Sequence, residues 1–217
     1  MSSFPLTPRN QVHRLPKRAS YDRDQIYGIL DQTFLCHAGF QVEGQVYVIP
    51  TIYGRREDTI YMHGSAASRM LKELAKGFDA CVTVTLLDGM VLARSAFHHS
   101  VNYRSVVLFG QARALTDPGE KSAALEIITE QVAPGRWAEV RGPNEKELKA
   151  TSVLAMPIDS ASAKIRTGGP IDDEEDYTLP VWAGVVPVRM AAGTPADDGR
   201  VLPGVGLPAS LSRARFL

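Results

Sequence analysis

Residues 60–72 combine the residue types that bind a phosphate group. They read Ile-Tyr-Met-His-Gly-Ser-Ala-Ala-Ser-Arg-Met-Leu-Lys, a strand-like run that ends in a small-residue turn and opens a helix. Backbone N–H groups, the hydroxyls of Ser65 and Ser68 and the guanidinium of Arg69 can converge on one anion at such a place. The pattern indicates a phosphate-binding turn. The alternative is that the serines are ordinary helix caps and Arg69 a solvated helix residue, and residue types alone do not decide between the two.

Two further segments carry side chains suited to a planar ligand. Tyr103, Arg104 and Ser105 follow Asn102 and open a run that is otherwise built for the core. They would line a heterocycle or cap the edge of a strand. Trp182, one of two tryptophans, stands near Gly184, and its indole would shield a cofactor ring or fill the core.

The sequence lacks other motifs for nucleotide binding and catalysis. Residues 118–122 lack the adjacent Gly-Lys of a P-loop, residues 204–206 follow no strand, and no Gly-x-Ser-x-Gly elbow occurs. Cys36 and His37 are sequence neighbours, so their side chains point to opposite faces of a strand. Hydrolytic catalysis therefore has no support.

The five histidines do not form a metal motif. They show neither the i, i+4 spacing nor the carboxylate companions of a zinc site. No metal site is predicted. His98 and His99 lie in a polar loop after a strand, where they are surface residues or the rim of a pocket.

The elements that must position these side chains alternate between short strands and helices. Capping residues and helical spacing predict helices from Ser20 or Asp22, over residues 66–76, from Asp117 and from Asn144. Hydrophobic runs rich in Val, Ile and Thr predict strands over residues 34–41, 45–53, 59–63, 80–87, 90–97, 103–115, 151–158 and 177–189. Asp88-Gly89 is typical of a tight hairpin turn. The prediction is a mainly β (α+β) fold, a small antiparallel barrel with helices packed around it.

Both ends of the chain differ in composition from its middle. Residues 1–19 are rich in proline and basic residues, and residues 191–217 are rich in glycine and proline, so we expect a flexible N-terminal arm and a C-terminal arm. The compact domain is expected over residues 20–190. Within it, the acidic residues 172–176 are expected to form a solvated loop, and Cys36 and Cys81 to be buried thiols.

The composition of the chain bears on its binding partners and on its location in the cell. The chain has 217 residues, 44% of them hydrophobic, with 24 basic and 24 acidic side chains. It therefore has no net charge to hold it on nucleic acid or on an anionic membrane surface. No apolar run approaches the roughly 20 residues of a membrane span, and the N-terminus lacks the apolar segment of a secretory signal. We expect a cytoplasmic protein that binds neither nucleic acid nor membranes.

Taken in chain order, three sets of residues resemble the flavin-binding split-barrel family related to pyridoxamine 5'-phosphate oxidase, especially its nitroimidazole-reductase branch. The sets are residues 48–53 with Pro50-Thr51, His63-Gly64 followed by Ser68-Arg69, and Tyr103-Arg104-Ser105-Val106 before Gly110. The likeness covers about residues 20–190. It implies an antiparallel Greek-key split barrel, a homodimer, and FMN bound in a cleft between subunits, with FAD or a deazaflavin as alternatives.

The resemblance also assigns sites. Residues 48–53 would run beside the isoalloxazine and ribityl chain, His63 and Gly64 would bound the phosphate loop, and Arg69 would pair with the phosphate. Ser105 stands where the oxidase has a flavin-contacting glutamine. The candidate cofactor-binding residues are Pro50, Thr51, Ile52, Tyr53, His63, Gly64, Ser65, Ser68, Arg69, Tyr103, Arg104, Ser105 and Trp182.

Several positions depart from the oxidase pattern. Met70 replaces a phosphate-binding lysine, so Lys72 would have to supply that charge from the next turn. Tyr53 stands where the oxidase places a lysine that holds the substrate phosphate. The Arg-x-His element that binds pyridoxal phosphate is missing, since residues 182–189 hold no histidine. The chain is therefore not expected to oxidise pyridoxamine phosphate, although the flavin scaffold can persist.

The leading interpretation is a homodimeric FMN oxidoreductase that passes electrons from NAD(P)H to a small electron-poor or quinone-like acceptor. The flavin supplies the hydride chemistry, so no dedicated acid or base is required and no catalytic residue is assigned. Arg104 and Ser105 are candidate donors to the N1 and C2 edge of the flavin, and His63 is a candidate proton relay. Two alternatives stay open: a flavin or haem carrier or sensor without turnover, and an apolar-ligand barrel without cofactor.

Overall fold

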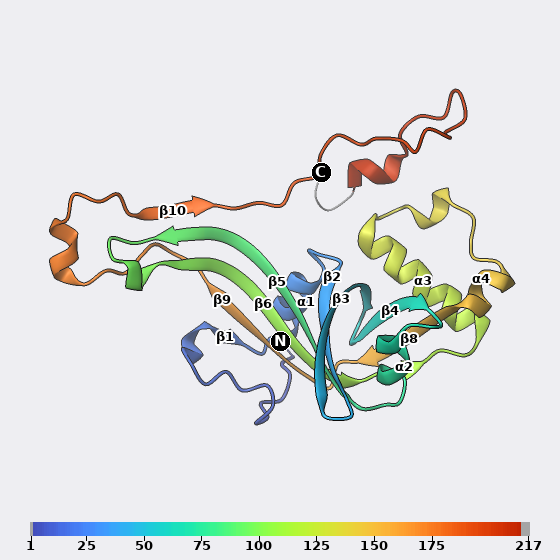
Figure 1. Ribbon diagram of the computed structural model, residues 1–217, viewed down its shortest axis with the longest axis horizontal. Coiled ribbons are helices and arrows are strands. Elements are labelled where there is room, and N and C mark those ends of the chain that lie inside the picture. The colour runs from blue at the N-terminus through green and yellow to red at the C-terminus, as the bar shows by residue number, and fades with distance from the viewer. Residues whose placement is uncertain (1, 214–217) are drawn as a thin grey trace.

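A single antiparallel sheet forms the body of the protein in the computed structural model, which describes residues 2–213 (Figure 1). The strands are β1 Ala19–Ser20, β2 Leu35–Val42, β3 Gln45–Arg56, β4 Thr59–Ser65, β5 Asp79–Leu92, β6 Ser100–Gln111, β7 Arg113–Ala114, β8 Thr151–Pro157, β9 Ser160–Arg166 and β10 Gly184–Pro187. Their order is β1-β9-β6-β5-β2-β3-β4-β8-β7, with β10 added along β5. The sheet therefore curls without closing, which confirms the predicted mainly β, split-barrel class.

Four α-helices accompany the sheet: α1 Arg23–Leu30, α2 Arg69–Leu74, α3 Pro118–Val132 and α4 Glu145–Ala150. The predicted caps are confirmed: the Asp22, Asp117 and Asn144 side chains each accept a hydrogen bond from a backbone N–H in the first turn. Helix α2 begins later than predicted. The N–H of Ala66 donates to the carbonyl of Ala150, so Ala66 continues the pairing of β4 with the chain at β8 and is not part of the helix.

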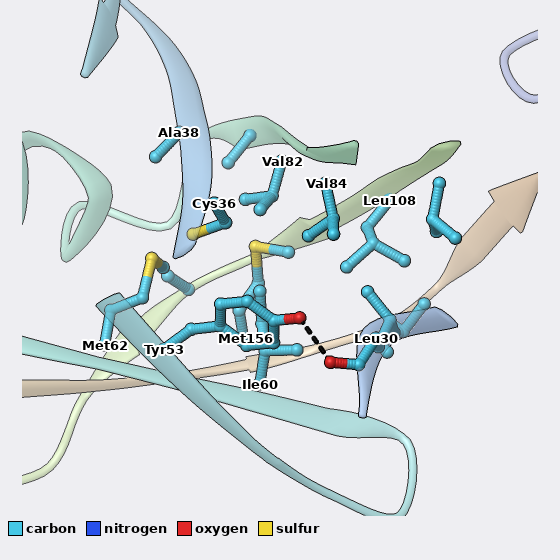
Figure 2. Close-up of a cluster of buried hydrophobic side chains, with 14 of the residues drawn as sticks. Leu30, Cys36, Ala38, Tyr53, Ile60, Met62, Val82, Val84, Leu108 and Met156 are labelled. Carbon is cyan, nitrogen blue, oxygen red and sulfur yellow. Dashed lines mark hydrogen bonds between the residues drawn. The ribbon is translucent and has the colours of Figure 1, made fainter. Parts of the chain in front are cut away.

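The main core lies on the inner face of the curled sheet, beneath α1 and α2 (Figure 2). Cys36 and Ala38 alternate with more exposed residues along β2, and Val82 and Val84 alternate with half-buried or exposed residues along β5. Tyr53 from β3 is also part of this core. It is 1% exposed, and its hydroxyl donates to the Leu30 carbonyl at 2.6 Å.

The prediction of a hairpin turn at Asp88-Gly89 is wrong. Strand β5 continues through both residues, with a shift in its register to β6 at this point, and the hairpin turn lies beyond Leu92. Asp88 accepts two hydrogen bonds from the Arg104 guanidinium, at 2.9 and 2.8 Å. Gly89 makes room for β10, because a Cβ there would lie 3.0 Å from the Val185 side chain. The residues that favour a tight turn instead form a β-bulge.

Two other expectations also change. Only Gly184–Pro187 of the predicted strand 177–189 is a strand, and Glu174–Thr178 forms a 3₁₀ helix instead. The acidic residues 172–176 are not all solvated. Asp172 is buried, where it accepts hydrogen bonds from the backbone N–H and the guanidinium of Arg94. That pairing compensates its charge in the interior.

Strands β5 and β6 run beyond the barrel as a long arm (Figure 1). The 3₁₀ helix Ala96–His98 forms its tip, and β10 lies along one edge of it. The chain then returns over the molecule toward α3, where Ser210 donates to the Glu139 carboxylate. At the other end of the chain, Phe4 is buried in the main core. In the described residues, no helix has the length and hydropathy needed to span a bilayer.

Replacing Gly110 by alanine is expected to destabilise the fold. A Cβ on Gly110 would lie 2.1 Å from the Pro157 carbonyl oxygen, so the backbone between β6 and β8 must move. Such overpacking typically costs about 1–3 kcal/mol or more. Denaturant unfolding measures the change. Gly28→Ala is the control, because Gly28 lies on the exposed side of helix α1 with open space at its Cβ. It is expected to stabilise by about 0.5–1 kcal/mol; equal midpoints for the two variants would contradict this packing.

The thiol of Cys36 is expected to react only after unfolding. Both cysteines are free, and burial raises the pKa of Cys36 to about 12. Since the thiolate is the reactive species, the folded protein should leave Cys36 unmodified by iodoacetamide at mildly alkaline pH. Peptide mass mapping should find it alkylated only when denaturant is present. Alkylation of Cys36 in the folded protein at the rate of a small free thiol would contradict the burial described here.

Candidate functional site

The turn between β4 and α2 presents an available guanidinium. The Ser65 hydroxyl accepts from the N–H of Ala67 at 3.2 Å, and the Ser68 hydroxyl accepts from the N–H of Leu71 at 3.4 Å. Both serines therefore act as local caps. Arg69 is exposed, and its guanidinium carbon lies 4.2 Å from the centroid of the Tyr47 ring. Among residues 2–213, no acidic side chain forms an ion pair with Arg69. The ring contact orients this charge and leaves it able to bind an anion.

His63 lies just before that turn and has an unsatisfied buried atom. Its Nδ1 is buried and has no hydrogen-bond partner within the described part of the chain. Desolvation lowers the pKa of the imidazole, so it is neutral at neutral pH. Next to it, Gly64 packs closely against α2, because a Cβ there would lie 3.1 Å from the Leu71 side chain. An orphaned polar atom beside an available cation is a feature that a bound polar ligand would explain.

The candidates on β3 face two ways. Pro50 pairs with His37 and Ile52 pairs with Leu35, on the face of the sheet away from the main core. Thr51 pairs with the buried Cys36, and the Tyr53 side chain is a core residue. Pro50 and Ile52 are therefore the side chains of this run that a ligand on the outer face can contact.

The candidates Arg104 and Ser105 lie on β6 where it passes from the arm into the barrel, and Trp182 precedes β10. The Arg104 guanidinium donates hydrogen bonds to Asp88 and Gln32, and the hydrogen bond to Asp88 raises the pKa of Arg104. Its charge is thus already compensated within the chain. The Ser105 hydroxyl donates to the Lys164 carbonyl at 3.3 Å. Trp182 is 66% exposed near Leu92 and packs over Gly184.

One chain does not bring all these candidates together. Figure 1 places α2 and β4 at one end of the molecule and β10, alongside the arm, at the other. The outer face that connects them is apolar and exposed at several positions. Its largest exposed side chains on β2, β3 and β5 are Leu35, Val46, Val48 and Leu87. An uncovered apolar sheet face of this kind is typical of an interface.

Two hollows of the chain lie away from these candidate residues. One, of about 250 Å³, lies between the end of α1, β3 and α3, where Arg55 donates to Asp31 at 2.8 Å. A second, of about 330 Å³, lies between the start of α3 and α4. Neither is lined by a candidate residue. Within residues 2–213 no group of three or more His, Cys, Asp or Glu side chains could hold a metal ion.

Comparison with known proteins identifies the family. A family model described as pyridoxamine 5'-phosphate oxidase matches residues 22–165. This chain belongs to that family. The resemblance drawn from residues 48–53, 63–69 and 103–110 is thereby confirmed.

Two solved structures are similar to this chain over nearly its whole length. The flavocytochrome Anf3 from Azotobacter vinelandii is 42% identical, with 97% of this chain and 98% of that chain covered and a TM-score of 0.90. An FAD- and haem-binding protein from Mycobacterium smegmatis is 38% identical, covering 91% and 97%, with a TM-score of 0.86. A putative 5-nitroimidazole antibiotic resistance protein from Bacteroides thetaiotaomicron shares the fold at 24% identity, covering 68% and 86%, with a TM-score of 0.57. No curated protein matches this chain.

Sequence reasoning missed one charged group that the fold places next to Tyr103. Arg166 ends strand β9 and pairs in register with Tyr103. Strand β9 was not predicted, because Ser160–Arg166 is rich in small residues buried on both faces and lacks period-two alternation. Its position in the sheet follows only from the pairing with β6 and β1.

Proposed function

We propose that this protein binds a flavin and a haem and transfers electrons through them. The observation that carries the proposal is the similarity to a flavocytochrome and to an FAD- and haem-binding protein, at 42% and 38% identity over more than 90% of each chain. When bound, the flavin supplies hydride and single-electron chemistry and the haem supplies single-electron chemistry. The protein supplies binding, orientation and the exclusion of competing reactions.

The residues present fit a flavin. Arg69 offers an uncompensated guanidinium beside the turn, where it would bind the flavin phosphate. Pro50 and Ile52 offer apolar surface for the ring on the outer face. The family resemblance implied FMN, with FAD as an alternative; we propose FAD as the flavin, because the relative from Mycobacterium smegmatis is described as binding FAD.

Two histidines fit a haem. Nδ1 of His99 lies 2.9 Å from the Ser95 carbonyl, which fixes this nitrogen as the donor and leaves Nε2 as a lone-pair donor for iron. Phe97 at the same arm tip is 89% exposed and offers apolar surface to a macrocycle. His37 stands on the outer face, with no hydrogen-bond partner within the described residues. Either imidazole would hold the haem iron.

Single alanine substitutions separate these two ligands. Loss of the Soret band in either His99→Ala or His37→Ala would identify the residue that holds the iron, while flavin absorption should persist. His13→Ala is the control, since His13 is exposed in the N-terminal segment. Parent-like haem spectra in both variants would contradict the assignment of these histidines.

We also propose that the functional unit is a homodimer. The Arg69 turn and the arm are separated within one chain, and the apolar outer face lies between them. Packing two chains through that face would bring the turn of one subunit toward the arm of the other. This is the arrangement that the family resemblance implies.

NAD(P)H as the electron donor and a small molecule as the acceptor complete the proposal. Anaerobic addition of NADH or NADPH should bleach the flavin, and an added quinone should restore its colour over many cycles. A protein that stays oxidised with both donors, or that is reduced once and never reoxidised, would instead be a carrier or sensor.

The effect of added FAD on the thermal stability of the apoprotein tests whether the cofactor binds. A ligand that binds only the folded state at a hundredfold excess over its Kd stabilises that state by about 2.7 kcal/mol. FAD added to the apoprotein should therefore raise its melting temperature, and adenosine at the same concentration should not. Equal melting temperatures with and without FAD, with FMN and haem equally ineffective, would exclude the proposed cofactors.

A further inference from the structure

Arg166 is a buried guanidinium built into the junction of the barrel and the arm. It is the last residue of β9 and is 6% exposed. Gly168 adopts a φ of +95°, which turns the chain back so that the carbonyls of Gly168 and Gly169 accept from Nη1 and Nη2, at 3.3 and 3.2 Å. The amide oxygen of Asn102 accepts from Nη1 as well, and the Asn102 amide donates to Gly168 at 3.0 Å.

Every one of these acceptors is neutral. Among residues 2–213, no carboxylate forms an ion pair with Arg166, and no acceptor is assigned to its Nε. Burial lowers the pKa of this guanidinium and the charge of Arg18 lowers it further, whereas the interaction with Tyr103 raises it. Buried charges in proteins are normally paired, because removing an ion from water is costly without a counter-charge. Within residues 2–213, Arg166 is therefore a buried cation whose hydrogen bonds all go to neutral groups.

The surroundings of Arg166 add positive charge. Arg18 immediately precedes β1, and Ala19 in β1 pairs with Lys164, two residues before Arg166. Within the described residues, neither Arg18 nor Lys164 forms an ion pair. On the other side, Tyr103 pairs with Arg166 in the β6–β9 ladder, so the phenol side chain leaves the same face of the sheet as the guanidinium. The junction thus gathers cations and a hydroxyl, the groups that bind carboxylate and phosphate.

We propose that Arg166, with Arg18 and Tyr103, forms an anion-binding subsite for a carboxylate or phosphate of a bound cofactor. The inference rests on the proposed function. The bound anion would be either a propionate of haem or the pyrophosphate of FAD. A cofactor anion is favoured because the subsite includes Tyr103, a residue of the candidate flavin-binding segment, and because it is separate from the exposed Arg69 turn.

Titration of the apoprotein with four ligands tests the subsite and separates its two sources. The ligands are FAD, FMN, haem and the dimethyl ester of haem, in which both propionates are masked. Arg166→Gln should weaken binding of one anionic cofactor by about tenfold or more, the size of a lost charge-assisted hydrogen bond. Weaker FAD binding with unchanged FMN binding would identify the pyrophosphate. Weaker haem binding with unchanged ester binding would identify a propionate.

Two substitutions serve as controls. Arg166→Lys keeps the charge and should recover part of the lost affinity. Arg113→Gln removes an exposed guanidinium that pairs with Glu120 elsewhere on the surface, and should bind all four ligands like the parent. If Arg166→Gln does not fold, Arg18→Gln carries the test with the same ligands and the same expected direction.

Parent-like affinity of Arg166→Gln for both FAD and haem would overturn the subsite. So would dissociation of the oligomer with unchanged cofactor affinity, because the counter-charge would then come from a second chain. These results are distinct from failure of the proposed function, in which the parent protein itself binds neither FAD nor haem.

Discussion

Replacing Arg69 by glutamine is expected to weaken FMN and FAD binding by about 10- to 150-fold. The guanidinium is exposed, oriented on the Tyr47 ring, and without an acidic partner in the described chain. A hydrogen bond to a charged group contributes about 1.5–3 kcal/mol, which corresponds to this range of dissociation constants. Flavin fluorescence titration of the apoprotein measures the change.

The same titration with riboflavin isolates the phosphate contribution. Riboflavin has no phosphate, so Arg69→Gln should bind it as the parent does. Lys76→Gln is the control, because Lys76 follows α2 and already pairs with Glu73. An equal loss of riboflavin and FMN affinity in Arg69→Gln would show that Arg69 supports the fold of the turn and does not bind phosphate.

Replacing Val48 by aspartate is expected to convert the proposed dimer into monomers and to release the cofactors. Val48 is 64% exposed on the outer face, opposite Gly39 of β2. In a dimer packed through this face, the new carboxylate would be buried without a partner, at a cost of several kcal/mol. Light scattering should then give a mass near 23.6 kDa for the variant and twice that for the parent.

Val140→Asp is the matched control, because Val140 is an exposed valine in the loop between α3 and α4. It should remain dimeric and keep its colour. A Val48→Asp protein that stays dimeric and retains parent amounts of flavin would contradict both the proposed interface and the location of the cofactor.

The parts of the fold that sequence reasoning predicts correctly are those decided by local physics. Asp22, Asp117 and Asn144 cap helices because a side-chain oxygen three residues before a backbone N–H satisfies it, whatever the tertiary context. The alternation in β2 likewise needs one buried and one exposed face only. These features required no knowledge of the rest of the chain.

The errors occur where distant segments decide the local structure. Asp88 and Gly89 have the composition of a turn, but Arg104 from β6 and β10 from the C-terminal region hold them in a strand. Asp172 looks like part of a solvated acidic loop, yet Arg94 on the arm pairs with it in the interior. Neither partner is visible from local sequence.

The candidate site likewise combines features decided by local sequence with features decided by distant segments. Residue type and order were enough to single out the Arg69 turn and the family. The burial of the Tyr53 side chain, the pairing of Arg104 with Asp88, and the unpaired charge of Arg166 depend on strand register. The boundaries at residues 19 and 190 between the domain and its arms stay predictions.

The visible absorption spectrum of the freshly purified protein tests the central claim most directly. We expect flavin bands together with a Soret band, and release of both FAD and haem on denaturation, identified by their masses. A colourless protein that releases neither molecule, and that stays colourless after incubation with both, would contradict it.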